Sequence, residues 1–447
     1  MKTNTYYFIG IGGIGMSSIA RFLLQQGNRV GGYDRTPSTL TQALQQQGAT
    51  ITYSDLQSAI PEAFRGKETC VIFTPAVPND HPQKHYFKAQ GNKLLKRAVF
   101  LGELTQNRAT LAVAGTHGKT TTTSILAHLL LSLEVPFTAF IGGVMNAQKS
   151  NLISTGTDLI LVEADEFDRS FLQLSPSIAC ITSTDADHLD IYGTKEEVTA
   201  SYRAFADKVQ EKLIVAKGIA IEGLTYSIEE EADYFVSDIH LEGFGYRFNL
   251  HSLKGVYEAV YFSQLGLHNL SNALAAFAVA SQYGIDETAM VKTLANFKGV
   301  ERRLQLVFQN EEHVLIDDYA HHPTEIEAVF HTLENAYPEE GKCVIFQPHL
   351  FTRTKDFLLE FAAALALFDR VILVPIYPAR EKPIKGISSE LLATKIGTRT
   401  SVNVIDKESL GEQIKTVNQK IKVVLGAGDI GLELKELKEN LLNNEAN

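Results

Sequence analysis

The sequence predicts an α/β protein built from three consecutive domains. Its 447 residues are too many for one ordinary hydrophobic core. Short apolar runs of strand length alternate with stretches of helical character, which is typical of parallel sheets covered by helices. Twice, such a run leads into a glycine-rich turn and then a helix. We predict a Rossmann-like domain over residues 1–107, a central α/β domain over 108–300 and a second Rossmann-like domain over 301–447.

The first domain is predicted from four strands and the helices between them. We expect strands at residues 6–11, 29–34, 50–54 and 70–77, and helices at 15–27, 39–48 and 96–108. The last of these helices leads out of the domain. Because strands and helices alternate, we predict a parallel sheet with helices on its faces.

The first glycine-rich turn follows the first strand. Gly10, Gly12 and Gly15 match the pattern G-x-G-x-x-G, and Asp34 follows about 20 residues later, at the end of the second strand. Such a turn presents backbone N–H groups and a helix N-terminus to a diphosphate. Taken alone, this pattern is compatible with a nicotinamide-dependent dehydrogenase.

The second glycine-rich turn changes that interpretation. A predicted strand at residues 109–116 leads into "GTHGKT", which ends at Thr120, and a helix follows. This is a phosphate-binding loop in which Lys119 reaches the terminal phosphates and the Thr120 hydroxyl can ligate Mg²⁺. The loop is a variant, because Val113 stands where the general pattern has glycine. A simple dehydrogenase has no use for this loop, so we predict an ATP-using enzyme that also holds a second phosphorylated ligand.

Acidic residues end the next two predicted strands of the central domain. The strand predicted at residues 157–165 ends in Glu163 and Asp165, and Glu166 and Asp168 follow it. The strand predicted within residues 177–188 ends in a second acidic group, which contains His188. Strand ends of an open parallel sheet face the ligand-binding edge. Carboxylate oxygens suit Mg²⁺ or Mn²⁺, so we predict a metal–nucleotide site there.

The third domain repeats the α/β pattern. We expect strands at 313–320, 342–350, 369–377 and 421–428, with helices at 323–337 and 354–368. Arg302 and Arg303 stand at the domain junction, where arginine suits phosphate or carboxylate contacts. His321 and His322 follow the first strand, and adjacent side chains on extended backbone point opposite ways.

Composition limits the partners. The formal net charge of −11 argues against general binding to nucleic acid or to a membrane surface. No stretch of 18 or more apolar residues occurs in the sequence, so we expect no membrane-spanning helix. Cys70, Cys180 and Cys343 each lie in or beside an apolar run, and we expect buried, reduced thiols and a cytoplasmic protein.

Nine segments together resemble the Mur ligases. They run in order from residue 10 to residue 430: "GIGGIGMS", "AGTHGKTTTTS", "VEADEFDRSF", "DADHLDIYG", "GLHNLSNALAA", "GVERRLQ", "DDYAHHPTEI", "QPHLFTRT" and "GAGDI". "DDYAHHPTEI" and "GVERRLQ" are the most specific of them. The resemblance implies a UDP-sugar-binding first domain, an ATP-binding centre and an amino-acid-binding third domain.

The resemblance also implies the reaction and its partners. ATP would phosphorylate the carboxylate of UDP-N-acetylmuramate, and the amine of L-alanine would attack the acyl phosphate to give an amide, ADP and phosphate. Mg²⁺ or Mn²⁺ would be the cofactor, and the protein would be a monomer or weak homodimer. Two alternatives stay open: a sister ligase that adds another amino acid or a preformed peptide, and a nucleotide-gated switch that only binds a UDP-sugar.

Site residues carried over by the resemblance fall into five groups. ATP would contact Gly115, Thr116, His117, Gly118, Lys119, Thr120, Thr121, His268, Asn269 and Asn272. The UDP-sugar would contact Gly12, Gly13, Ile14, Gly15, Asp34, Thr74 and Ala76. Metal ions would be held by Thr120, Glu163 and His188. The amino-acid or phosphate side would hold Arg302, Asp318, Tyr319 and Arg353. The catalytic candidates are Lys119, Glu163, His188, Arg303, His321 and His322. The proton of the attacking amine would be accepted by His321, by His322 or by solvent.

Overall fold

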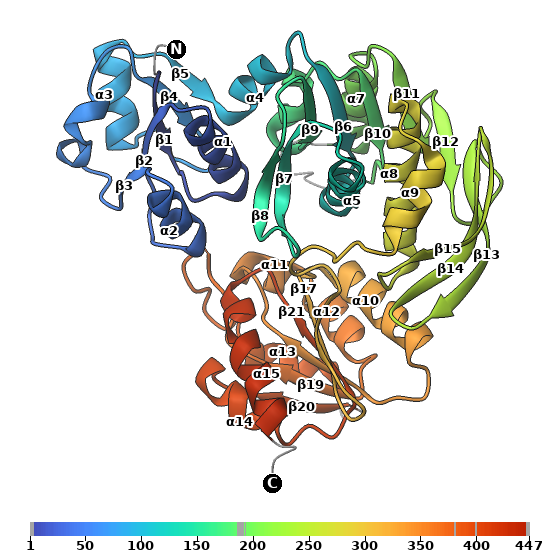
Figure 1. Ribbon diagram of the computed structural model, residues 1–447. Helices are drawn as coiled ribbons and strands as arrows, with labels where there is room; N and C mark the ends of the chain where they lie inside the picture. Colours follow the sequence, from blue (N-terminus) through green and yellow to red (C-terminus); the bar gives the residue numbers. More distant parts are fainter. Residues whose placement is uncertain (1–3, 186–191, 193, 380, 398–399, 444–447) are drawn as a thin grey trace. The chain divides into compact units, whose positions relative to one another are not determined.

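The computed structural model describes residues 4–185, 192, 194–379, 381–397 and 400–443 (Figure 1). Its strands form three sheets, which lie within residues 5–96, 109–262 and 305–425. The chain divides into two compact units, and the first two sheets belong to the first unit. The turn at 241–245 and the segment at 264–267 group with residues 299–447 in the second unit.

The first sheet has the Rossmann order β3-β2-β1-β4-β5, and all its strand pairs are parallel. Its elements are β1 (Thr5–Ile9), α1 (Ile14–Gln25), β2 (Arg29–Tyr33), α2 (Thr39–Gln46), β3 (Thr50–Thr52), β4 (Cys70–Phe73), α3 (Pro82–Gln90), β5 (Leu94–Lys96) and α4 (Arg97–Thr105). The four strands expected from the sequence are confirmed. β5 is an addition, and its three residues are too few for an apolar pattern to reveal.

The middle sheet has ten strands in the order β15-β14-β13-β12-β11-β10-β6-β9-β7-β8. Its strands are β6 (Ala109–Ala114), β7 (Thr138–Met145), β8 (Ser150–Ser154), β9 (Leu159–Glu163), β10 (Ile178–Ile181), β11 (Lys212–Ala216), β12 (Leu224–Ser227), β13 (Tyr234–Glu242), β14 (Gly245–Ser252) and β15 (Gly255–Phe262). Its helices include α5 (Lys119–Ser132), α7 (Lys195–Ala206), α8 (Leu267–Tyr283) and α9 (Glu287–Leu294). The phosphate-loop strand β6 lies between β10 and β9, so three predicted strands are neighbours at the sheet centre.

Two antiparallel ladders in this sheet were not expected from the sequence. β7 pairs antiparallel with β8, and β14 pairs antiparallel with β15. They add to the buried strands that the sequence predicted for the central domain. Long half-exposed hairpins read as polar, turn-rich sequence, because only one of their faces needs to be apolar.

A continuous hydrophobic core joins the first sheet to the middle sheet within the first unit. Helix α1 packs against β7 and β8. Phe22 of α1 meets Phe140 of β7 edge to face, with ring centroids 5.5 Å apart. Asn151 of β8 donates hydrogen bonds to the carbonyl of Ile14 (2.7 Å) and to the hydroxyl of Ser17 (2.9 Å).

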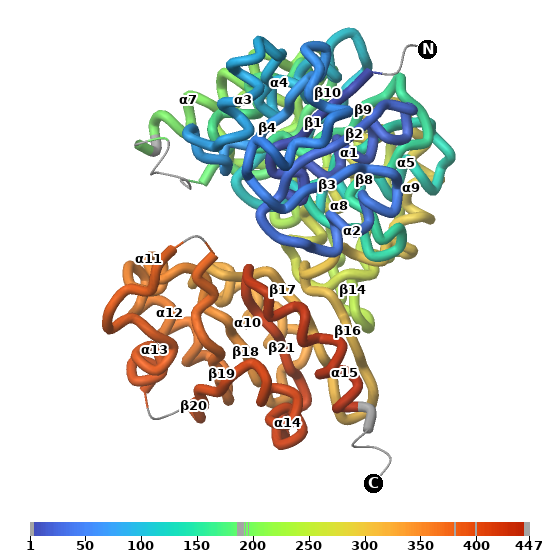
Figure 2. Tube along the Cα trace, turned by 90° about the vertical axis from the view of Figure 1, so that its left-hand side faces the viewer, coloured from blue at the N-terminus to red at the C-terminus, as the bar shows by residue number. Residues whose placement is uncertain are grey.

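The third sheet has the order β16-β17-β21-β18-β19-β20 (Figure 2). Its elements are β16 (Gln305–Gln309), β17 (Val314–Asp318), α10 (Pro323–Ala336), β18 (Lys342–Phe346), α11 (Phe351–Asp356), α12 (Leu358–Leu365), β19 (Arg370–Leu373), α13 (Ser389–Ile396), β20 (Ser401–Val404), α14 (Leu410–Ile414), β21 (Ile421–Leu425) and α15 (Leu434–Asn443). The four predicted strands are confirmed, and β16 adds an antiparallel edge.

Helices cover both faces of the third sheet. One face packs on α10, α12 and α13, and the other packs on α14 and α15. Strand residues alternate between the two apolar clusters, as the period of two requires. Cys180 and Cys343 are buried and unbridged, and Cys70 is half-buried. Within the described residues, the helices are all too short or too polar to cross a bilayer.

Candidate active site

The phosphate loop connects β6 to α5 and depends on two glycines. Gly115 has φ +137° and Gly118 has φ +82°, values that side-chain-bearing residues rarely adopt. A Cβ atom on residue 118 would also overlap the amide oxygen of Asn272. Val113 stands where the general pattern has glycine, but it lies in the buried strand β6, before the turn begins. Its side chain therefore does not prevent the loop from forming.

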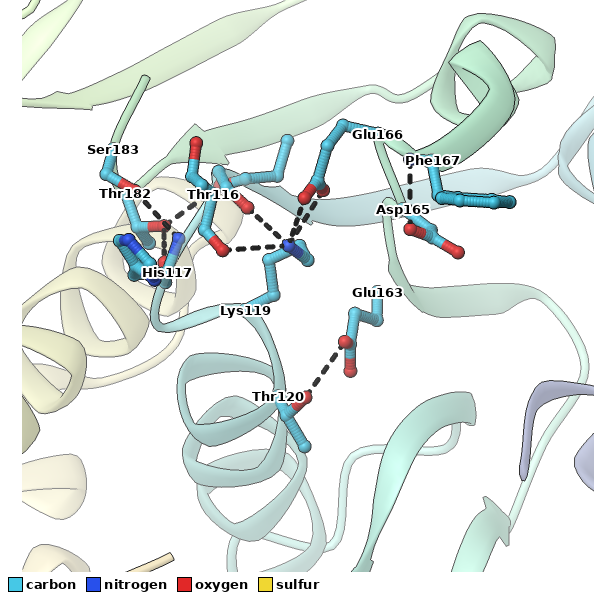
Figure 3. A network of polar contacts seen from close by, with 12 residues as sticks. Thr116, His117, Lys119, Thr120, Glu163, Asp165, Glu166, Phe167, Thr182 and Ser183 are labelled. Atoms are coloured by element: carbon cyan, nitrogen blue, oxygen red, sulfur yellow. Dashed lines mark hydrogen bonds and ion pairs between the residues drawn. The ribbon is translucent and has the colours of Figure 1, made fainter. Parts of the chain in front are cut away.

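Lys119 is held inside the loop by acceptors on three sides (Figure 3). Its Nζ donates to the carbonyls of Gly115 and Thr116, the latter at 3.2 Å, and forms an ion pair with Glu166 at 2.7 Å. Glu166 is buried, and burial raises the pKa of its carboxyl group although the Lys119 ammonium opposes this. The Glu166 carboxylate thus occupies one side of the Lys119 ammonium group, which is the group predicted to contact a phosphate.

Thr120 and Glu163 place two oxygen ligands side by side. The Thr120 hydroxyl donates to Oε1 of Glu163 at 2.9 Å (Figure 3). Oε2 of Glu163 accepts the backbone N–H of Gly142 at 2.8 Å. Mg²⁺ commonly takes one carboxylate, a hydroxyl, water and substrate phosphates, so this donor pair fits the ion. His188 lies outside the described residues, and a cluster of three metal-ligating side chains is not found within them.

Helix α8 supplies the predicted asparagines. Asn272 is buried, and its Oδ1 accepts the Thr122 hydroxyl at 3.2 Å, so it lies beside the start of α5. Asn269 is buried one turn earlier, whereas His268 is exposed. The other loop residues are held locally: the Thr116 hydroxyl donates to the carbonyl of Asp185, and the N–H of His117 donates to Ser183.

The first glycine loop lies between the ends of β1 and β2. The backbone carbonyl oxygen of Tyr33 accepts hydrogen bonds from the N–H groups of Gly10 and Ile11, and Oδ2 of Asp34 accepts the N–H of Gly12 at 2.6 Å. Thr74 lies beside this loop: a Cβ atom added to Gly10 would be 2.7 Å from the methyl group of Thr74. Ala76, two residues later, is exposed. Asp34 thus bridges the loop and β2, and its contact with ribose or uridine stays a prediction.

The third sheet gathers rings and a cation after β17 and β18. The ring of His321 lies 5.4 Å from that of Tyr319 and 6.0 Å from that of His349, measured between centroids. Nδ1 of His321 lies 2.9 Å from the carbonyl oxygen of Tyr319. A carbonyl only accepts, so Nδ1 carries the hydrogen and Nε2 of neutral His321 keeps a free lone pair. Burial lowers the pKa of His321, which favours that neutral form.

Arg353 extends the same face. Its Nη1 is buried and has no hydrogen-bond partner in the described part of the chain. Its positive charge also helps to lower the pKa of His321, so the two side chains are near each other. His322 points elsewhere, as expected for adjacent histidines: Nδ1 lies 2.9 Å from the Thr324 hydroxyl and the ring contacts Phe357.

Comparisons with known proteins place the whole chain in one family. Family models described as "Mur ligase family, catalytic domain", "Mur ligase middle domain" and "Mur ligase, glutamate ligase domain" match residues 5–109, 113–280 and 302–430. The chain belongs to the Mur ligase family.

Individual relatives are similar over nearly their full length. UDP-N-acetylmuramate–L-alanine ligases of Christiangramia forsetii and Flavobacterium johnsoniae are 47% and 46% identical, each with 98% of both chains covered. The crystal structure of UDP-N-acetylmuramate-alanine ligase from Thermotoga maritima superposes with a TM-score of 0.84 at 26% identity, covering 98% of this chain and 99% of the other.

Two residues predicted to face a ligand in this Mur ligase hydrogen-bond to backbone groups, and their ligand contacts stay predictions. The Arg302 guanidinium donates to the carbonyls of Gly426 and Gly428, and the oxygens of Asp318 accept the N–H groups of Leu304 and Ala320 at 2.7 Å. Arginine and aspartate satisfy such buried backbone groups well, so the geometry gives Arg302 and Asp318 a buttressing role. Arg303 lies over the Tyr319 ring, 5.6 Å from its centroid, and is the better ligand candidate.

Sequence reasoning about this Mur ligase missed the contacts of four residues at the predicted sites. Asp165 and Glu166 were noted only among the acids that end a strand, and neither Arg97 nor His349 was assigned a role. Arg97 begins α4 and donates to Asp165 at 2.8 Å. The only local signal was a basic pair, Lys96-Arg97, at a strand–helix junction.

Proposed function

We propose that this Mur ligase joins L-alanine to the carboxylate of UDP-N-acetylmuramate at the expense of ATP, releasing ADP and phosphate. The observation that carries the proposal is the near-full-length similarity to UDP-N-acetylmuramate–L-alanine ligases, in a chain whose phosphate loop places Lys119 beside Glu166 and Thr120 beside Glu163. A carboxylate is a poor electrophile, and phosphorylation supplies a leaving group.

The phosphate loop supports the ATP half of the reaction. Lys119 would exchange Glu166 for the terminal phosphate oxygens, and the backbone N–H groups between Gly115 and Thr121 would hold the remaining charge. Thr120 and Glu163 would hold Mg²⁺ or Mn²⁺, which would neutralise phosphate charge when bound. Asn269 and Asn272 would lie near the nucleotide.

The third-domain face supports the amino-acid half. Arg353 would bind the carboxylate of L-alanine, because its buried Nη1 is unpaired within the described residues and guanidinium forms strong bonds to carboxylates. His321 would accept the proton of the attacking ammonium group through Nε2, since its Nδ1 is committed to Tyr319. Arg303 would meet the transferred phosphate or the acyl phosphate.

A coupled assay tests the proposal. The protein is incubated with ATP, Mg²⁺ and UDP-N-acetylmuramate, and phosphate release is measured with and without L-alanine, glycine, serine or a tripeptide. Release that requires L-alanine, with a product heavier by one alanyl residue, supports the proposal. Release that requires the tripeptide indicates a sister ligase, and release independent of any amine indicates a nucleotide-gated switch.

The proposed cellular compartment follows from the substrates and from the unbridged thiols. Cys180 and Cys343 are buried and unbridged, which suits a reducing compartment. We therefore propose a cytoplasmic enzyme that acts without nucleic acid or membrane, as a monomer or weak homodimer. Sedimentation in the presence and absence of substrates measures that last point.

A further inference from the structure

The predicted diphosphate site of the first domain is poor in free N–H donors. Of the loop amides, Gly12 donates to Asp34 and Gly13 donates to the carbonyl of Gly10. Only the first N–H groups of α1, those of Ile14 and Gly15, lack an acceptor in the described part of the chain. Asp34 also brings a negative charge to the loop. A diphosphate here needs a cation.

Arg97 is positioned to be that cation. A Cβ atom on residue 15 would overlap Nη1 of Arg97, so the guanidinium lies directly over the glycine at the start of α1. Its Nη2 donates to Asp165 at 2.8 Å, and this is its one hydrogen bond to the described residues. Its side chain is 23% exposed, so the remaining donors are open to a ligand.

Asp165 fixes this arrangement from the other side. It follows β9 and lies two residues after Glu163, and Arg97, Glu163 and Asp165 line one small cavity. With Nη2 bonded to Asp165, Nη1 is directed at the loop. A planar guanidinium held at one edge presents its other edge in a defined direction.

We infer that Arg97 binds the diphosphate of the sugar nucleotide and that Asp165 is the residue that positions it. The inference rests on the proposed function, since it assigns a residue to the UDP-sugar that the enzyme would use. It also gives a reason for Gly15: any side chain there would displace Arg97 from the loop.

A neighbouring ion pair provides a matched control. Lys96 pairs with Asp168 at 2.8 Å, so it links the same two segments of the first unit as Arg97 and Asp165 do. No glycine of the loop has Lys96 above it among the positions described. If Arg97 only joined the segments, Lys96→Ala and Arg97→Ala would have similar effects.

The test measures KM for both substrates and inhibition by UDP and UMP. Arg97→Ala should raise KM for UDP-N-acetylmuramate about 10- to 100-fold, as expected for loss of a charge-assisted phosphate contact, and leave KM for ATP within about twofold. Wild-type enzyme should prefer UDP to UMP, and Arg97→Ala should lose that preference. Arg97→Lys should recover part of both, and Lys96→Ala should resemble wild type.

Asp165→Ala should raise the same KM less than Arg97→Ala does, and the double variant should be no worse than Arg97→Ala alone. An unchanged preference for UDP in Arg97→Ala and Arg97→Lys would overturn the inference, as would equal effects of Lys96→Ala. Wild-type enzyme that neither binds nor uses UDP-N-acetylmuramate would instead overturn the proposed function. Thermal midpoints of all variants show whether each is folded.

Discussion

At the scale of single residues, the sites of this Mur ligase hold their cations with carboxylates. Glu166 holds Lys119 and Asp165 holds Arg97, and both acids lie on the segment after β9. Each carboxylate satisfies a cation that would otherwise be partly buried without a partner. A phosphate that replaces Glu166 at Lys119 preserves this balance of charge, whereas Asp165 would stay bonded to Arg97 while the other edge of the guanidinium meets a phosphate.

Lys119→Ala should abolish ligation while leaving sugar-nucleotide binding nearly intact. Loss of one charge-stabilising group at a transferring phosphoryl centre costs at least about 100-fold in kcat. Because Lys119 contacts no residue of the first glycine loop in any described hydrogen bond, the Kd for UDP-N-acetylmuramate measured by calorimetry should stay within about twofold. Parallel loss of catalysis and binding would contradict this separation.

Asp317 should make the second unit less stable as the pH rises toward neutrality. Burial raises the pKa of its carboxyl group to about 7, although Arg302 opposes the shift. The folded state therefore binds the proton more tightly than the unfolded state, and stability falls between about pH 4 and pH 7. Asp317→Asn should raise the thermal midpoint most at pH 8, roughly half as much at pH 5.5, and little below about pH 4.

Asp429 serves as the control for this prediction. Lys407 and Gln347 hydrogen-bond to its carboxylate and lower its pKa, outweighing the opposing effect of its partial burial. The ionised form is therefore stabilised, and that stability is present at both pH values. Asp429→Asn should lower the midpoint at pH 5.5 and at pH 8, and a gain at either would contradict the argument.

At the scale of elements, helix starts position the site residues. Glu325, in the first turn of α10, accepts the N–H groups of His321 (2.9 Å) and His322 (3.0 Å). Pro323 begins the helix, where its missing N–H costs nothing. The capping carboxylate therefore fixes the backbone that carries the proposed proton acceptor.

Glu325→Ala should lower kcat about tenfold and the free energy of unfolding by about 1 kcal/mol, the usual cost of a lost cap. Glu325→Gln keeps an oxygen acceptor and should retain most of the activity. Steady-state kinetics and denaturant unfolding measure the two effects. Equal activity losses in both variants would mean that the charge of Glu325, and not its cap, matters.

At the scale of the whole molecule, the first two sheets share one core. Phe8, Phe22 and Phe140 belong to a single buried cluster that spans both sheets. The first unit should therefore unfold in one cooperative transition rather than as two domains. The third sheet has its own two clusters, and we expect a separate transition for it.

Phe22→Ala should destabilise the first unit by about 3–5 kcal/mol, the cost of deleting a buried aromatic ring. Calorimetry should show one transition moving to lower temperature while the second stays in place. Phe368→Ala, which removes the partner of Phe330 in the second unit, should move only the other transition. A first-unit transition that splits in two would show that the sheets unfold independently.

The sequence by itself determined the features that are local along the chain. Strand–loop–helix order and both glycine loops were readable because backbone freedom, hydrophobic period and residue type act over a few positions. The metal role of Thr120 and Glu163 stays a prediction. Short and half-exposed strands such as β5, β14 and β15 were missed because their patterns are too weak.

Only the tertiary structure decided which distant side chains meet. In the structure Arg97 lies over Gly15, Glu166 forms an ion pair with Lys119, and the ring of His321 lies near that of His349. Arg302 and Asp318 hydrogen-bond to backbone groups. These pairings come from packing between elements far apart in sequence, where no local propensity records the partner. The first glycine loop shows the difference: the sequence predicts an anion site there, and only the fold shows that the guanidinium of Arg97 lies beside it.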